Sequence, residues 1–146
     1  MAGDRVEILL VEDNAADEEL TLHALKLNRL ENDIHVVRDG AEALEFLFCT
    51  DRYADRKIDQ APKVVLLDLK LPLVDGLEVL RQVKADPRTR AIPVVVLTSS
   101  REERDIVESY ELGVNSYITK PVDFGQFTDS VRQLGMYWLL LNQPSS

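Results

Sequence analysis

Polar side chains follow four of five short apolar stretches, each at the point where the stretch ends. Glu12 and Asp13 follow the first stretch, Asp68 the third, Thr98 the fourth and Lys120 the fifth. Two crowded carboxylates repel by roughly 4 kcal/mol at about 4 Å and an effective dielectric of about 20, so such a group needs a cation. A few hard oxygen ligands suit Mg²⁺. An aspartate beside a metal and an ammonium is suited to phosphoryl transfer.

Asp68 is the candidate nucleophile of this set, and Lys120 would offset one negative charge. Each residue alone has a simpler explanation. Asp68 could cap the next turn, Glu12 and Asp13 could begin a helix, Thr98 could be an ordinary strand residue, and Lys120 could be solvated. Complementary groups at four strand ends together favour one shared site.

The spacing of apolar residues predicts five strands that alternate with five helices. The predicted strands are 6–11, 33–37, 63–68, 92–98 and 115–119. The predicted helices are 15–28, 40–48, 76–86, 101–112 and 123–141. The third and fourth strands are apolar throughout, which is typical of parallel strands covered on both faces. The fold class is therefore α/β, a doubly wound parallel sheet, which binds ligands at the carboxyl ends of its strands.

Length, charge and cysteine content limit the possible functions. The 146 residues fit one domain, 1–146, in which the polar segment 49–62 is either an extension of the second helix or a long loop. A net charge of −9 disfavours nucleic acid and anionic lipid as partners. One cysteine allows no intrachain disulfide, and the apolar run 136–141 is too short to span a bilayer. We therefore expect a cytoplasmic protein.

Four stretches of the sequence resemble the motifs of response-regulator receiver domains, and they occur in the same order. They are ILLVEDN (8–14), LLDLKLPLVDG (66–76), VVLTSS (95–100) and SYITKP (116–121). The resemblance spans nearly the whole chain. It implies a flavodoxin-like, CheY-like five-stranded sheet with strand order 2-1-3-4-5. It also implies a phosphorylation-controlled signalling protein that does not act as an enzyme on a separate substrate.

The resemblance further implies a role for each residue of the motifs. Asp68 would accept a phosphoryl group from a partner histidine kinase. Mg²⁺ would bind directly to Asp13 and Asp68, through water to Glu12, and to the backbone carbonyl of Lys70. Lys120 would pair with the phosphoryl group.

Two residues are implied to change position when the protein is phosphorylated. Thr98 resembles the switch hydroxyl of the family, and Tyr117 resembles the aromatic side chain that moves inward. The repacked face would comprise the fourth helix, the fifth strand and the fifth helix. The Lys120–Pro121 peptide bond is expected to be cis.

Two positions, Glu12 and Lys70, and two segments set this sequence apart within the family that it resembles. Glu12 replaces the more common aspartate, while Lys70 and Ser100 occupy positions that tune loss of the phosphoryl group. The long connection 49–62 and the apolar extension 136–146 resemble the single-domain regulators that partner bacterial phytochrome kinases.

The fifth predicted helix carries more apolar residues than one face can bury. We expect it to form a homodimer, although the extension could instead fold back on its own domain. The expected interface residues are Phe127, Val131, Tyr137, Trp138 and Leu140.

Three other functions agree less well with the sequence. A phosphohydrolase with an aspartate nucleophile would place a second acid two residues later, where this chain has Lys70. An interaction module that is never phosphorylated would not need the complete set of acids, threonine and lysine. A histidine phosphotransfer protein would be all-helical, which the apolar strands exclude.

Overall fold

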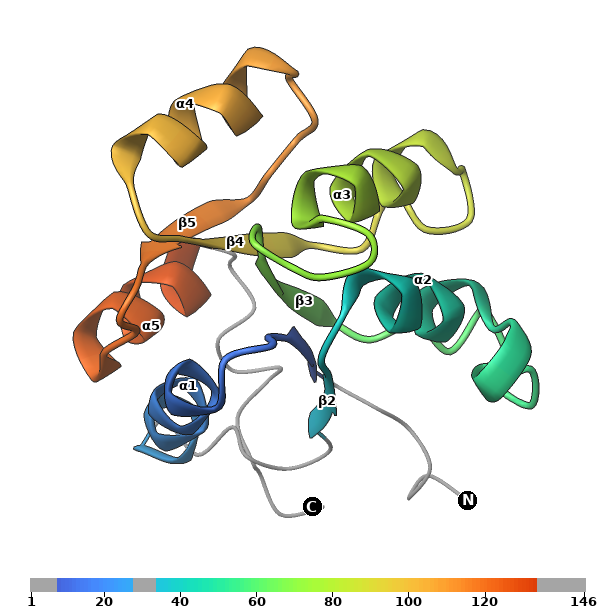
Figure 1. Cartoon of the computed structure of the whole chain (residues 1–146), viewed down its shortest axis with the longest axis horizontal. Coiled ribbons are helices and arrows are strands. Elements are labelled where there is room, and N and C mark those ends of the chain that lie inside the picture. Colours follow the sequence, from blue (N-terminus) through green and yellow to red (C-terminus); the bar gives the residue numbers. More distant parts are fainter. Residues whose placement is uncertain (1–7, 28–33, 134–146) are drawn as a thin grey trace.

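Five parallel strands form the centre of the molecule, with helices on both faces (Figure 1). The computed structural model describes residues 8–27 and 34–133. The strands are β1 (Ile8–Val11), β2 (Ile34–Val37), β3 (Val64–Asp68), β4 (Val94–Thr98) and β5 (Ser116–Thr119). They are ordered β2-β1-β3-β4-β5, and every neighbouring pair is parallel. The predicted doubly wound sheet and its strand order are confirmed.

The helices divide unequally between the two faces of the sheet (Figure 1). One face is covered by α1 (Ala15–Leu27) and α5 (Phe124–Gln133), and the other by α2 (Gly40–Phe48), α3 (Gly76–Ala85) and α4 (Arg101–Ser109). The fourth helix ends at Ser109 and not at 112, because the backbone of Glu111 is left-handed, with φ 51°. The part of the fifth predicted helix after Gln133 lies outside the described residues.

Alternation along the strands builds a separate core on each face. Leu9 and Val11 of β1 pack with apolar residues of α2, α3 and α4, whereas Ile8 and Leu10 pack with those of α1 and α5. This follows because successive side chains of a strand point to opposite faces. The same alternation holds in β3 and β4, whose residues are all buried. Two helical layers therefore hold the strand ends in fixed positions.

Two residues of the expected dimer interface are buried in the chain's own core. Phe127 and Val131 are each only 2% exposed and pack against the sheet, so they are not available to a second copy. Phe124, an apolar residue three positions before Phe127 in the same helix, is 47% exposed. The expectation for Phe127 and Val131 was therefore wrong. Tyr137, Trp138 and Leu140 lie outside the described residues.

The segment 49–62 is a loop with one short helical turn and does not extend α2. Cys49 adopts a left-handed backbone, with φ 59°, and ends the helix. The 3-10 helix η2 (Asp51–Tyr53) follows. This resolves the alternative that the sequence left open.

Side chains fix this loop to α2 and to the edge strand β2. The Tyr53 hydroxyl donates to Glu42 and lies 2.9 Å from Nε2 of His35. The Arg56 guanidinium stacks on the Phe46 ring, 3.7 Å from its centre, and donates to the Phe46 carbonyl oxygen. The loop is thus attached to the domain by an aromatic and a cationic contact.

The loop between β3 and α3 folds tightly against the end of its own strand. Gly76 donates its amide to the Leu69 carbonyl at 2.9 Å. A Cβ atom on Gly76 would lie 2.2 Å from the Asp68 carbonyl oxygen, so only glycine fits here. Asp75 caps α3 by accepting from the Glu78 amide. This close packing holds the backbone of Asp68 in place.

Candidate functional site

Three carboxylates meet at the carboxyl edge of the sheet, as the sequence predicts. Glu12, Asp13 and Asp68 each offer an oxygen atom, and these oxygens lie within 4.8 Å of one another. Glu12 is completely buried, Asp68 is 4% exposed and Asp13 is exposed. The buried strands β1 and β3 are neighbours in the sheet, which is why their terminal acids converge.

Lys120 provides the positive charge among these acids. Its ammonium donates to Asp68 Oδ2 at 3.0 Å and to Glu12 Oε2 at 3.1 Å. A third carboxylate, Asp17 Oδ2 of α1, lies 2.8 Å from the same nitrogen. Asp17 was not predicted as part of the site, because an acid in the first turn of a helix ordinarily complements the helix dipole. The peptide bond after Lys120 is cis, as the resemblance implies.

Burial and charge shift the pKa values of Glu12 and Lys120. Burial, together with the neighbouring Asp68, raises the pKa of Glu12 to about 8, although Lys120 partly offsets both effects. Burial alone would lower the pKa of Lys120, but Asp17, Asp68 and Glu12 together raise it above its usual range. Lys120 therefore stays charged. Its single positive charge does not bring the pKa of Glu12 down to that of a surface carboxylate.

A cavity of about 370 Å³ opens onto these groups and could hold a cation. Asp13, Asp17, Asp68 and Lys120 line it. Among the described residues, Glu12 Oε1 is one of the buried side-chain atoms that has no hydrogen-bond partner. Clustered carboxylates with an unsatisfied buried oxygen are the donor set that a hard divalent cation such as Mg²⁺ prefers. The residues present therefore fit a Mg²⁺ ion.

Lys70 contributes to the site with its backbone, while its side chain points to another acid. Its amide donates to Asp68 Oδ1 at 3.2 Å. Its ammonium lies 3.3 Å from Glu103 Oε2, and the lysine side chain is 76% exposed. Glu103 also accepts from the Ser99 amide at 2.9 Å and from its hydroxyl at 3.1 Å. Ser100 and Glu103 also have the spacing of a capping box, a pattern that by itself gives Glu103 no role beside Asp68.

Thr98 and Tyr117 share a second, smaller cavity beside the first. Both residues line a space of about 240 Å³ between β4, β5 and the start of α4. Thr98 is buried, and its carbonyl accepts from the Lys120 amide at 2.7 Å. The Tyr117 ring lies under the guanidinium of Arg104, with 4.6 Å between that group and the ring centre. The two expected switch residues, Thr98 and Tyr117, thus line the same cavity.

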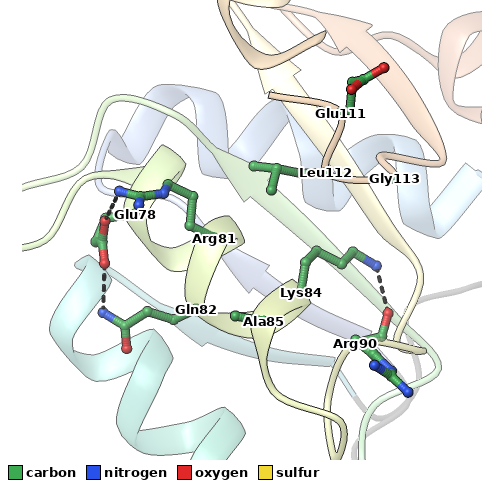
Figure 2. Close-up of a pocket in the computed structure, with 9 residues that line it drawn as sticks. All are labelled: Glu78, Arg81, Gln82, Lys84, Ala85, Arg90, Glu111, Leu112 and Gly113. Atoms are coloured by element: carbon green, nitrogen blue, oxygen red, sulfur yellow. Dashed lines mark hydrogen bonds and ion pairs between the residues drawn. The ribbon is translucent and has the colours of Figure 1, made fainter. Parts of the chain in front are cut away.

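A larger cavity of about 660 Å³ lies away from these acids (Figure 2). It is bounded by α3, from Glu78 to Ala85, and by the segments that precede β4 and β5. Figure 2 shows Arg81 directed to Glu78, and the ammonium of Lys84 directed to the Arg90 carbonyl, 3.0 Å away. Glu78, Arg81 and Lys84 therefore already have partners in this cavity, which lacks the convergent carboxylates of the acidic edge.

Comparison with known proteins places this arrangement in a family. The model of the response regulator receiver domain matches residues 8–132. Response regulator Rcp1 of Synechocystis sp. is 41% identical over 132 residues, which are 90% of this chain and 88% of Rcp1. The Mn²⁺-bound crystal structure of Rcp1 superposes with a TM-score of 0.73, at 39% identity over 97% of this chain and 99% of that one.

Two further solved structures are similar over almost their full length. The bacteriophytochrome response regulator AtBRR is 56% identical, with a TM-score of 0.84, over 95% of this chain and 98% of AtBRR. The phosphorylated cyanobacterial phytochrome response regulator RcpA is 43% identical, with a TM-score of 0.73, over 92% of this chain and 94% of RcpA. Within the described part of the chain, no helix has the length and apolar character needed to cross a membrane. The acidic edge, the strand order and these similarities show that the chain belongs to the response regulator receiver domain family.

Proposed function

We propose that Asp68 accepts the phosphoryl group by which this receiver domain is controlled. The observation that carries the proposal is the position of its carboxylate, at the end of a buried strand and 3.0 Å from the Lys120 ammonium. A carboxylate oxygen of Asp68 attacks the phosphorus of a phosphohistidine, and the phosphorus–nitrogen bond breaks. The imidazole nitrogen leaves with the electron pair and takes up a proton, while Asp68 becomes an acyl phosphate.

The surrounding residues orient the reactants and balance their charge. Asp13 and Asp68, the backbone carbonyl of Lys70 and, through water, Glu12 would hold a Mg²⁺ ion. When bound, Mg²⁺ neutralises charge on the phosphoryl oxygens. Lys120 pairs with the acquired phosphoryl group, whose charge is close to −2 at neutral pH.

Thr98 and Tyr117 carry the signal away from Asp68. The Thr98 hydroxyl donates to a phosphoryl oxygen, and the Tyr117 ring moves into the space that Thr98 vacates. The cavity that both residues line supports this assignment. The resulting change repacks α4, β5 and α5, and the modified protein populates a second conformation.

The phosphodonor is a histidine kinase, because receiver domains take their phosphoryl group from such partners. The kinase we propose is a bacterial phytochrome. The support is the description of AtBRR and RcpA as phytochrome response regulators. We further infer that residues 1–146 act as one receiver domain in the cytoplasm, and that the chain signals without acting on a separate substrate.

The test is phosphorylation by a small phosphodonor. The protein is incubated with MgCl₂ and acetyl phosphate, and the intact mass is measured. We expect a phosphoadduct in the wild type and none in Asp68→Asn. Asp75→Asn is the matched control, because Asp75 is an exposed acid of the following loop and asparagine also caps helices. An adduct that persists in Asp68→Asn would assign the phosphoacceptor elsewhere.

A homodimer through the extension after α5 remains part of the proposal, without Phe127 and Val131. Tyr137, Trp138 and Leu140 are its remaining interface residues. Light scattering at micromolar concentration, with and without a phosphoryl mimic, is the test. A monomer under both conditions would remove the dimer from the proposal and leave the receiver function intact.

A further inference from the structure

Lys70 contacts both Asp68 and α4, the first through its backbone and the second through its side chain. Its amide touches Asp68 Oδ1, whereas its ammonium lies 3.3 Å from Glu103 Oε2, in the first turn of α4. Lys70 and Ser99 also line the cavity that opens onto Asp68. The ammonium therefore lies at the rim of the space that a phosphoryl group would enter, with a competing carboxylate as its present partner.

Glu103 is the fixed half of this pair. Only 16% of its side chain is exposed, and it accepts two hydrogen bonds from Ser99. Its own amide donates to Ser100 Oγ, the N-cap of α4. Burial opposes its ionisation, but the bonds from Ser99 and Lys70 together lower the pKa of Glu103, so it is ionised at neutral pH. Glu103 thus joins the end of β4, the start of α4 and Lys70.

Lys70 is the more exposed member of this ion pair. Its side chain is 76% exposed, and exposed ion pairs of this kind are weak and easily exchanged. A phosphoryl group on Asp68 would add nearly two negative charges within reach of the lysine. A single carboxylate that already accepts two hydrogen bonds competes poorly with such a group.

We propose that Glu103 is a positioning residue that holds the Lys70 ammonium away from Asp68 in the resting protein and releases it to the phosphoryl group. When Lys70 leaves, Glu103 loses its cationic partner, and the segment that begins at Ser99 becomes free to move with α4. The inference rests on the proposed function of Asp68 and adds a second connection to α4, separate from Thr98 and Tyr117.

A double-mutant cycle tests the proposal with beryllofluoride, a phosphoryl mimic, in the presence of MgCl₂. Glu103→Gln removes the charge but keeps an oxygen for the Ser99 amide. It frees Lys70, so we expect beryllofluoride to bind about two- to fivefold more tightly, the range expected for loss of an exposed ion pair. Lys70→Met should weaken binding. In the Lys70→Met background, Glu103→Gln should have no further effect.

Amide hydrogen exchange gives a readout that does not depend on affinity. Beryllofluoride should accelerate exchange of the amides from Ser99 to Glu103 in the wild type, whereas Glu103→Gln should show fast exchange without it. The matched control is Glu108→Gln, which removes a carboxylate of α4 that is paired with Arg104 at 2.9 Å. This variant should match the wild type in both measurements.

The outcomes separate the two proposals. In one outcome, the wild type binds beryllofluoride while Glu103→Gln changes the affinity equally in the wild-type and Lys70→Met backgrounds. That result would overturn the positioning role and leave Asp68 as the phosphoacceptor. If Glu103→Gln does not alter binding at all, the positioning role is also overturned. If the wild type neither binds the mimic nor forms a phosphoadduct, both proposals fail.

Discussion

The Lys120 ammonium lies 3.1 Å from the carboxylate of Glu12, a side chain with no exposed surface. Lys120→Met leaves Glu12, Asp17 and Asp68 without their shared cation. Breaking a buried pair costs about 3–5 kcal/mol, and we expect the lower end, about 3, because Glu12, with its raised pKa, can carry a proton instead of a charge. A divalent cation can replace the lost charge. MgCl₂ should therefore raise the free energy of unfolding of the variant more than that of the wild type, as measured by urea titration.

Lys84→Met is the control for this experiment. Lys84 is also partly buried, but its ammonium donates to the carbonyl oxygens of Arg90 and Ile92, at 3.0 and 2.9 Å. The variant should lose stability without gaining from MgCl₂. Equal rescue of both lysine variants would show that Lys120 is not the counter-charge of the acids.

Gly76→Ala should destabilise the fold at the site itself. The added Cβ atom would lie 2.2 Å from the Asp68 carbonyl oxygen, and backbone atoms there cannot move aside. We expect a loss of about 1–3 kcal/mol in urea unfolding, the cost of overpacking. Gly125→Ala in α5 is the control, because its nearest contact is 3.6 Å away. That change should stabilise the protein by about 0.5–1 kcal/mol, and an equal loss in both variants would contradict the steric argument.

His35 should make the stability depend on pH. Burial lowers the pKa of His35 from 6.5, Glu42 opposes this effect, and Arg56 adds to it. The unfolded chain therefore binds a proton more readily than the folded one. The contribution of neutral His35 to the free energy of unfolding is fully present above pH 6.5. It is lost as the pH falls through the lower pKa of His35 in the folded protein.

The measurement is the free energy of unfolding between about pH 7 and pH 5. His35→Phe keeps an aromatic ring against Phe46 but removes the titration, so its curve should be flatter than that of the wild type. His23→Gln removes the exposed histidine of α1 and serves as the control. A slope that is unchanged in His35→Phe would assign the pH dependence to other groups.

Arg56→Lys should loosen the loop 49–62. The guanidinium stacks on the Phe46 ring at 3.7 Å and also donates to Gln60, a combination that an ammonium cannot reproduce. We expect a loss of about 1 kcal/mol and faster proteolysis within the loop. Arg88→Lys is the matched control, since its guanidinium lies 5.8 Å from the Phe48 ring. Similar losses in both variants would argue against the stacking contact.

Residues that end a strand could be placed from the sequence, and residues that approach from a helix could not. Asp68 and Glu12 were predicted because apolar runs define β1 and β3, and parallel strands bring their ends to one edge. Asp17 and Glu103 depend on how α1 and α4 sit above that edge, which the period of a helix does not specify. For the same reason, the sequence placed Lys70 beside Asp68 but did not show that Glu103 of α4 is the partner of its side chain.

The assignment of faces in α5 shows a second limit. The apolar spacing correctly gave a stripe containing Phe127 and Val131, but it could not say whether the stripe meets the chain's own sheet or another molecule. Phe124 belongs to the same spacing and is nevertheless exposed. It is the first residue of α5, whereas Phe127 and Val131 lie further along the helix and are buried.

The bond from Lys120 to Glu12 spans 108 positions of the sequence. During synthesis the acids of β1 and β3 therefore emerge long before the lysine that balances them. A chain that still lacks β5 carries the carboxylates without their built-in cation, and a phosphodonor would meet an uncompensated negative surface. The charge balance of the acidic edge is therefore completed only when the last strand and Lys120 have been made.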